Sequence, residues 1–154
     1  MKERYKNVLV VDLMLTRMNE KTGKEEFLLS LRKNTGSNDG EYELPGGHVE
    51  LEPNEDLIEA MIRETKEELD IDLKEEDLKI IHILHHYTEG RLNFILKSNK
   101  YSGNIKINEP EKCERLEWFS YENIPDNVTS KVKNTLKEIK SGIFYDNINF
   151  KKIK

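Results

Sequence analysis

Hydrophobic residues near the start of the chain occur in two short runs separated by polar residues. Residues 7–16 read NVLVVDLMLT, residues 27–31 read FLLSL, and the polar segment 19–24 lies between them. Runs rich in Val and Leu that are joined by a Gly-containing turn are typical of a β-hairpin. We therefore expect the fold to begin with two paired strands.

A polar connector, residues 34–40, leads to a short extended segment, residues 42–44. Pro45 restricts Leu44 to extended conformations, which favours a third strand there. The next two residues, Gly46 and Gly47, allow a tight turn or a close approach of the backbone to another group. We expect this glycine turn to be available to a ligand.

The hydrophobic period then changes from that of a strand to that of a helix. Over residues 55–69, Ile58, Ile62, Thr65 and Leu69 recur at spacings of four, three and four. This spacing places them in one stripe along a helix. The pattern predicts a helix over 55–69 that buries this stripe.

Three strands and a second helix are predicted after the first helix. The expected strands are residues 78–84, 92–96 and 116–119, and the first two are joined by a turn at 87–90. The second helix is expected over 128–139, with Gly142 as a stop signal just beyond it. Its Lys131, Lys133, Lys137 and Lys140 are expected on the solvated side. The order β-β-β-α-β-β-β-α, with hairpins in place of regular crossovers, favours an α/β (α+β) fold: a mixed sheet in an α/β/α sandwich.

Length and composition narrow the class of protein. A chain of 154 residues fits one domain, expected over 1–154. The net charge of -5 argues against a stable complex with nucleic acid, which requires a basic surface. No apolar stretch approaches the roughly 20 residues that span a bilayer, and no signal sequence precedes the first strand. The one cysteine, Cys113, agrees with a reducing compartment, so we expect a cytoplasmic protein without a membrane partner.

The chemistry of the chain is concentrated in Glu64, Glu67 and Glu68. Residues three and four apart are neighbours on a helix, so these glutamates share a face about a quarter-turn from the apolar stripe. Their mutual repulsion is relieved if a cation lies between them. Oxygen ligands favour Mg²⁺, or Mn²⁺ as a substitute, over Zn²⁺. The alternative is a plain solvated acidic helix, and spacing alone does not separate the two.

The surrounding residues resemble the box of the Nudix hydrolase family, G-x5-E-x7-R-E-U-x-E-E-x-G-U, where U is apolar. Here Glu55, Arg63, Glu64, Glu67 and Glu68 stand at matching positions, after the segment 45–50, PGGHVE. Three departures occur: Gly47 lies two residues farther from Glu55, Thr65 replaces an apolar residue, and Asp70 replaces a glycine. Asn54 and Asp70 both tolerate left-handed backbone geometry. Later segments, at 91–94, 108–119 and 121–125, resemble the MutT-type branch of the family.

The resemblance implies a role for each matching residue. Glu64, Glu67 and Glu68 are expected to hold the metal, together with the backbone of Gly47, and one glutamate to act as base. The catalytic group is then Glu64, Glu67 and Arg63, in which Arg63 orients Glu67 from four residues away. A late loop often supplies a further carboxylate, for which Glu109 or Glu111 is the candidate. Arg32 and Glu109 are the candidates for contact with substrate, although a surface Arg is the more common case.

The resemblance also implies an activity: magnesium-dependent hydrolysis of a phosphoanhydride in a small nucleotide substrate. A nucleoside triphosphate would give a monophosphate and pyrophosphate. The alternatives are an ADP-ribose or nucleotide-sugar pyrophosphatase, an mRNA-cap or dinucleoside polyphosphate hydrolase, and a binding module of the same fold without catalysis. A homodimer is also expected from the resemblance.

For Trp118 and Phe119 we expect packing, and for His82, His85 and His86 packing or solvent contact, because the sequence does not show them converging.

Overall fold

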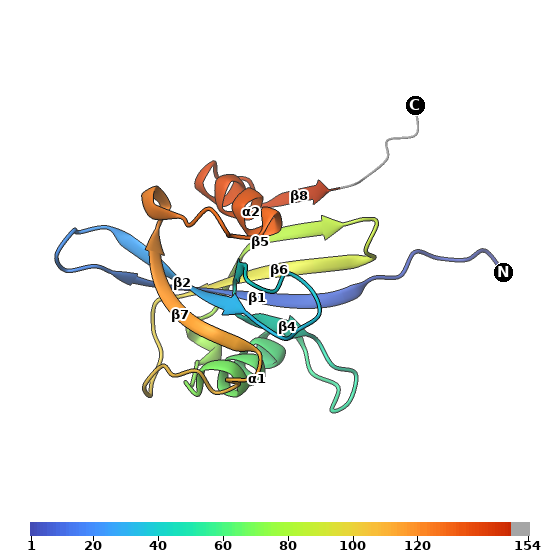
Figure 1. The fold of residues 1–154 in the computed structure, drawn as a ribbon. Coiled ribbons are helices and arrows are strands. Elements are labelled where there is room, and N and C mark those ends of the chain that lie inside the picture. Colours follow the sequence, from blue (N-terminus) through green and yellow to red (C-terminus); the bar gives the residue numbers. More distant parts are fainter. Residues whose placement is uncertain (149–154) are drawn as a thin grey trace.

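The computed structural model describes residues 1–148, in which two helices enclose a mixed sheet (Figure 1). The helices are α1 (Leu57–Leu69) and α2 (Ser130–Lys140), and two short 3-10 turns lie at Glu75–Asp77 and Tyr121–Asn123. The strands are β1 (Val8–Met18), β2 (Glu25–Arg32), β3 (Tyr42–Glu43), β4 (Gly46–His48), β5 (Lys79–His86), β6 (Arg91–Ser98), β7 (Cys113–Ser120) and β8 (Tyr145–Ile148).

The strands run in the order β3-β2-β1-β6-β5-β8, with β4 paired to β1 and β7 paired to β2. The pairs β1–β6 and β5–β8 are parallel, whereas the remaining pairs are antiparallel. The sheet is therefore mixed, which confirms the predicted fold class. Both predicted hairpins, β1–β2 and β5–β6, are present.

Strand β1 is buried on both faces because a helix covers each side of the sheet. Val11, Leu13 and Leu15 pack in the cluster that contains Met61 of α1. Met14, from the alternate face, packs in the cluster that contains Val132 and Leu136 of α2. Alternation along the strand thus sends odd positions to α1 and even positions to α2. Asp12, an even position in this aliphatic run, is placed on the α2 side and is 4% exposed.

Helix α1 is fixed at both ends by side chains or backbone geometry specified in the sequence. It begins at Leu57, two residues later than predicted, because Asp56 is its N-cap and forms a capping box with Glu59. It ends at Leu69, and the C-cap residue Asp70 has a left-handed φ of 54°, as expected from the position of a family glycine. Thr65 is fully buried, and its hydroxyl donates to the Met61 carbonyl at 2.6 Å, so it occupies the apolar stripe without an unpaired polar group.

The extra residues between Gly47 and Glu55 project away from the rest of the protein. In Figure 1 the loop between β4 and α1 extends outward from the sandwich. Leu51 at its tip is 81% exposed, and Asn54 has the expected left-handed φ of 66°. The longer loop therefore does not separate β4 from α1. These two elements carry residues of the Nudix-like box, and they remain in contact with each other.

Strands β4 and β8 were not predicted. The segment Gly46–His48 has two glycines, which are depleted in strands, and it pairs with β1 by backbone hydrogen bonds. Strand β8 lies at the sheet edge and is only four residues long. In both cases the pairing depends on a partner distant in sequence, which local patterns do not encode.

Candidate active site

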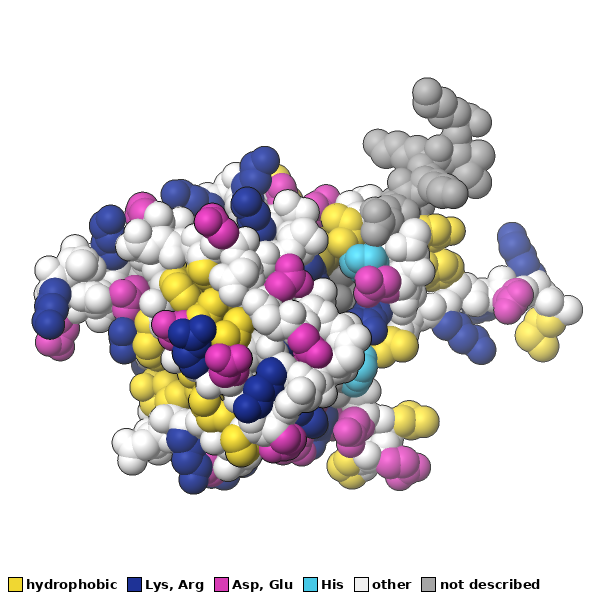
Figure 2. Space-filling view, viewed as in Figure 1, with side chains coloured by type: hydrophobic (Ala, Val, Ile, Leu, Met, Phe, Trp, Pro, Cys, Tyr) yellow, Lys and Arg dark blue, Asp and Glu magenta, His cyan; other side chains and the backbone are white. Residues whose placement is uncertain are grey.

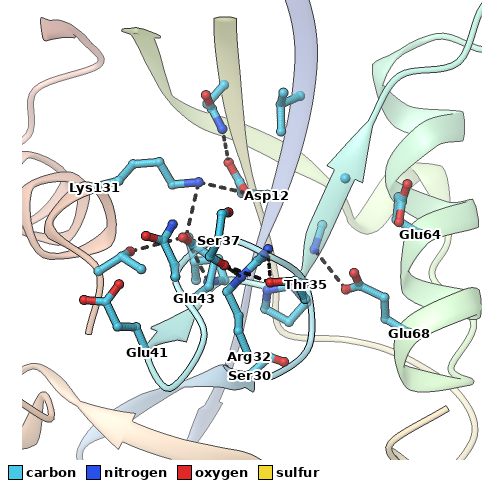
Figure 3. A pocket seen from close by; sticks show the side chains of 18 of the residues that line it. Asp12, Ser30, Arg32, Thr35, Ser37, Glu41, Glu43, Glu64, Glu68 and Lys131 are labelled. Carbon is cyan, nitrogen blue, oxygen red and sulfur yellow. Dashed lines mark hydrogen bonds and ion pairs between the residues drawn. The ribbon is translucent and has the colours of Figure 1, made fainter. Parts of the chain in front are cut away.

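A cleft of about 1200 Å³ lies between the two helices, beside the point where β1 meets β4. Figure 3 shows Glu64 and Glu68 on one side of it and Lys131 of α2 on the opposite side. All the predicted site residues line this cleft: Arg32, Gly47, Arg63, Glu64, Glu67, Glu68 and Glu109. Glu111 is not among its lining residues. The fold therefore brings together side chains from segments more than 70 residues apart.

The two glycines of β4 are in direct contact with two glutamates of α1. The Gly46 N–H donates to Glu68 Oε2 at 3.0 Å. A Cβ on Gly47 would lie only 2.3 Å from Glu64 Oε1, so the Glu64 carboxylate occupies the space that a side chain would need. Gly46 itself has a φ of 155° and lies against the Val11 carbonyl, which also excludes a Cβ. The glycine turn is thus required for α1 to approach this strand closely.

Arg63 connects the carboxylates of α1 to the loop before the helix. Its Nε and Nη2 donate to the two oxygens of Glu55 at 2.9 and 2.6 Å. Its Nη1 donates to Glu64 at 2.9 Å and to Glu67 at 3.2 Å, so the expected pairing with Glu67 is present. Nη2 also donates to the His48 carbonyl at 3.0 Å. The guanidinium therefore positions three carboxylates and one backbone carbonyl at once.

The acidic groups of the cleft differ in how far they are removed from water. Burial, followed by the charge of Glu64, raises the pKa of Glu68 to about 8. Burial also raises the pKa of Glu64, against the opposing effect of Arg63. The charge of Glu109 contributes to raising both pKa values. Glu67, by contrast, has a side chain that is 52% exposed.

These residues have the chemistry of a site for a hard divalent cation. In the described part of the chain no three His, Cys, Asp or Glu side chains already converge on one point. Arg63 binds Glu67, and the Gly46 N–H binds Glu68. However, Glu64 and Glu68 are poorly hydrated carboxylates that repel each other and lie against a bare glycine backbone. A cation would relieve this repulsion, and the carboxylates of Glu64 and Glu68 offer oxygen ligands, which Mg²⁺ prefers.

Arg32 forms hydrogen bonds to the loop that follows β2. Its Nε donates to the Ser37 carbonyl at 3.1 Å, and its Nη2 donates to Thr35 Oγ1 at 3.0 Å. Asp39 closes the same loop by accepting from the Thr35 and Gly36 backbone N–H groups. Arg32 thus shapes the wall of the cleft, and only its remaining donors are left for a ligand.

The expectation for Lys131 is wrong, because this residue does not face solvent with the other lysines of α2. Its ammonium lies 3.2 Å from Glu43 Oε1 and 3.6 Å from Asp12 Oδ1 (Figure 3). Asn93 donates to Asp12 at 2.7 Å, and Thr129 donates to Glu43 at 3.1 Å. Burial lowers the pKa of Lys131, but attraction to Asp12 and Glu43 outweighs it and raises the pKa overall.

The sequence patterns did not identify the residues of this second polar group as part of the cleft. One signal was present: Asp12 interrupts the aliphatic run of β1, where a buried charge requires a partner. Its partners Glu43, Asn93 and Lys131 lie at least 31 residues away, so periodicity does not identify them.

The other residues considered as functional candidates have structural roles or lack the surroundings that catalysis would need. Trp118 packs beside the core and carries Arg17 over its ring at 4.3 Å, and Phe119 packs edge-on against Tyr42. Buried His82 bonds the Ile143 carbonyl through Nδ1. Burial raises the pKa of Cys113, which accepts from Ser30 Oγ, so its thiol is a poor nucleophile.

Comparison with known families and structures agrees with this arrangement. The family model described as the NUDIX domain matches residues 7–139. Because the match covers most of the chain, the protein belongs to the NUDIX family, and it is a Nudix hydrolase.

Solved structures share the fold at low sequence identity. The MutT NUDIX hydrolase from Burkholderia pseudomallei has a TM-score of 0.72 at 24% identity, over 86% of this chain and 97% of that one. The MutT protein from Methanosarcina mazei Go1 has a TM-score of 0.70 at 23% identity, over 91% and 97%. The NUDIX domain of Shewanella oneidensis NrtR, in complex with ADP ribose, has a TM-score of 0.69 at 14% identity, over 88% and 87%.

Two surface features bear on partners. No helix in residues 1–148 is long and apolar enough to cross a membrane. Basic and acidic side chains alternate over the face seen in Figure 2, without an extended basic area.

Proposed function

We propose that the protein hydrolyses the phosphoanhydride of a nucleoside diphosphate-linked substrate and depends on Mg²⁺ for this activity. The observation that carries the proposal is the contact between β4 and α1. There, the Glu64 carboxylate occupies the space that a Cβ on Gly47 would need, and Glu68 accepts a hydrogen bond from the Gly46 N–H. Two poorly hydrated carboxylates and the adjoining backbone of Gly47 supply the oxygen donors that would hold the cation.

The metal, when bound, would neutralise charge on the diphosphate and lower the pKa of a coordinated water. Glu64, Glu68 and the Gly47 carbonyl would provide most of its protein ligands. Glu67 is the most exposed of the three glutamates, and we assign to it the removal of a proton from the attacking water. Arg63 would keep Glu64 and Glu67 in place through the bonds from its Nη1.

Glu109 and Arg32 would act at the margins of this site. Glu109 is held by Lys112 at 3.1 Å and lies close enough to influence both Glu64 and Glu68, so it is the candidate for an additional metal contact. Glu111 is less suited, because it does not line the cleft. Arg32 retains donors on Nη1, which could contact a phosphate oxygen while Nε and Nη2 hold the loop.

For the substrate, we propose a nucleoside triphosphate, split to a monophosphate and pyrophosphate, as the resemblance to MutT-type proteins implies. A diphosphate that carries a second sugar is the other candidate, and the observation that favours it is the polar character of the cleft wall beside α2.

We also propose that the protein acts in the cytoplasm, with Mn²⁺ as a substitute metal. A homodimer remains part of the proposal and is tested by light scattering.

The test is incubation of the purified protein with a panel of nucleoside triphosphates, nucleotide sugars and dinucleoside polyphosphates, with and without Mg²⁺. We expect release of phosphate products only with the metal, and loss of turnover by a factor of about 10² or more in Glu67→Gln, the range for a general base. Saturable binding without product under any divalent metal would leave the protein a binding module and refute the proposal.

A further inference from the structure

The connection between β6 and β7 supplies the C-terminal cap of helix α1. The last four carbonyls of an α-helix have no partner within the helix itself. In this protein the Leu69 carbonyl accepts from the Lys106 N–H at 3.1 Å, and the Glu68 carbonyl accepts from the Asn108 N–H at 3.0 Å. In Figure 1 the same connection passes beside α1 on its way to β7. The connection is therefore bonded to the helix that carries the glutamates of the site.

The side chain of Asn108 completes this cap. Its Nδ2 donates to the Glu67 carbonyl at 2.9 Å and to the Lys66 carbonyl at 3.4 Å. Asn108 is an exposed residue, so its contribution comes from these hydrogen bonds and not from the burial of apolar surface. Through its backbone and its side chain, one residue thus bonds three consecutive carbonyls of α1, at positions 66, 67 and 68.

The residue that follows, Glu109, is held from its other side as well. Pro110 disfavours the helical conformation for residue 109 and keeps its backbone extended. The Glu109 carbonyl accepts from the Lys112 and Cys113 N–H groups at 3.0 and 3.1 Å, and its carboxylate lies 3.1 Å from Lys112 Nζ. With Asn108 bonded to α1 on the preceding side, Glu109 has little freedom to move relative to the helix.

This loop presents the Glu109 carboxylate to the carboxylates of α1. Glu109 lines the cleft together with Glu64 and Glu68, and its side chain is 27% exposed. Its charge is one of the causes that raise the pKa values of both glutamates. Repulsion between these like charges opposes the arrangement, so the loop needs an attachment that holds it in place. Asn108 provides that attachment at the adjacent position.

We propose that Asn108 is a positioning residue, which bonds the β6–β7 connection to the end of α1 and thereby fixes Glu109 beside Glu64 and Glu68 for binding of a divalent ion. This inference rests on the proposed function, which assigns a metal contact to Glu109. Asn108 is not among the residues of 1–148 that line the cleft, so it acts through Glu109 and not on the substrate. A carboxylate that is already in place loses less conformational freedom when an ion binds, so its support changes the affinity.

The experiment is calorimetric titration with Mn²⁺ of the wild-type protein, Asn108→Ala, Glu109→Gln and the double variant. We expect each single substitution to weaken Mn²⁺ binding about tenfold, within the range for residues that support metal ligands. The double variant should lose no more than about the same tenfold, because Asn108 acts through Glu109 and the two effects are not additive. A residue that only capped the helix would leave the Mn²⁺ affinity of Asn108→Ala at the wild-type value.

Lys106→Ala is the matched control from the same connection. The ammonium of Lys106 lies 2.9 Å from Asp70, and the two side chains are 60% and 34% exposed, so this ion pair contributes little. The substitution retains the backbone bond to Leu69, and Lys106 is not among the residues of 1–148 that line the cleft. We expect Lys106→Ala to bind Mn²⁺ within about twofold of the wild-type affinity.

A metal-free measurement separates this inference from the proposed function. Cys113 is the only cysteine of the chain, and its N–H bonds the Glu109 carbonyl, so its labelling by a thiol reagent in EDTA reports opening of the loop. We expect labelling to be about fivefold faster in Asn108→Ala, the effect of one lost hydrogen bond on a local opening equilibrium, and unchanged in Lys106→Ala.

The outcomes divide between the two claims. A wild-type protein that binds no Mn²⁺ would refute the proposed function, and the labelling rates would then decide the inference. Wild-type Mn²⁺ affinity in Asn108→Ala or in Glu109→Gln, losses that multiply in the double variant, or an unchanged labelling rate in Asn108→Ala would each overturn the inference.

Discussion

The guanidinium of Arg63 binds the carboxylate of Glu55 through two N–H donors, one to each oxygen, at 2.9 and 2.6 Å. The Glu55 side chain is only 5% exposed, and its Oε1 also accepts from the Glu50 N–H. The hydrogen bond from Arg63 is the main cause of the lowered pKa of Glu55. This pair fixes the end of the loop against α1, and the remaining donors of Arg63 are then directed at Glu64 and Glu67.

Replacing Arg63 with Lys should impair activity more than folding. A lysine retains the charge but lacks the planar fork, so it cannot hold Glu55 bidentately while contacting Glu64 and Glu67. We expect a loss of about 10- to 100-fold in kcat/KM, the range for a partner that orients metal ligands. The comparison is with Arg17→Lys, whose salt bridge to Glu26 lies outside the cleft, and a variant at 63 with wild-type kinetics would contradict the positioning role.

The two glycines of β4 should respond differently to alanine. In Gly47→Ala the new Cβ meets the Glu64 carboxylate, a side chain that can move, so we expect loss of activity with the fold retained. In Gly46→Ala the Cβ would lie 2.0 Å from the Val11 carbonyl, which cannot yield without moving β1, so we expect a large loss of stability. Thermal melts and kcat measured side by side separate these effects. Gly23→Ala, with open space around it and only a φ of 67°, should cost about 1 kcal/mol.

The fold was predictable from sequence wherever a local hydrophobic period specified it. The stripe of α1 and both hairpins follow from neighbouring residues alone, whereas the left-handed geometry of Asp70 was expected from the glycine at that position of the Nudix box. The strand β4 was not predictable in this way, because its glycines carry no side-chain pattern and its pairing is with β1, 34 or more residues earlier. Resemblance to a known box placed the glutamates, and spacing alone could not have separated them from a solvated helix.

Lys131 illustrates why the rest of the site was missed. Its spacing from Lys133, Lys137 and Lys140 is ordinary for a solvated helix, and only the approach of β1 and β3 turns it into a buried partner of Asp12 and Glu43. Such a contact depends on how three distant segments pack. The interrupted aliphatic run at Asp12 was the one local sign of it.

Stability of the metal-free protein should fall as pH rises from about 5 to 8. Glu68 has a folded pKa of about 8, whereas an unperturbed Glu has a pKa of about 4.3. Between these values the folded state binds more protons than the unfolded state, so the free energy of unfolding decreases as pH increases. Melting curves in EDTA at several pH values test this. Glu68→Gln should show a smaller decline, and parallel curves for the two proteins would contradict the assignment.

Removal of the N-cap of α1 should affect stability without affecting chemistry. Asp56 Oδ1 accepts from the Ile58 and Glu59 N–H groups, both at 2.9 Å, and Asp56 lies outside the cleft. We expect Asp56→Ala to lower the free energy of unfolding by about 1 kcal/mol. Denaturant titration measures this change, with Asp56→Asn, which preserves the cap, as the control. A loss of kcat in the folded Asp56→Ala protein would show that the start of the helix contributes to the reaction.

Calorimetric titration with Mn²⁺ at pH 8 tests most directly whether the glutamates of α1 bind a divalent metal. We predict saturable binding to the wild-type protein, weakened about tenfold or more in Glu68→Gln and unchanged in Glu75→Gln, which alters an exposed glutamate away from the cleft. Absence of binding to the wild-type protein, or equal affinities in all three proteins, would contradict the account.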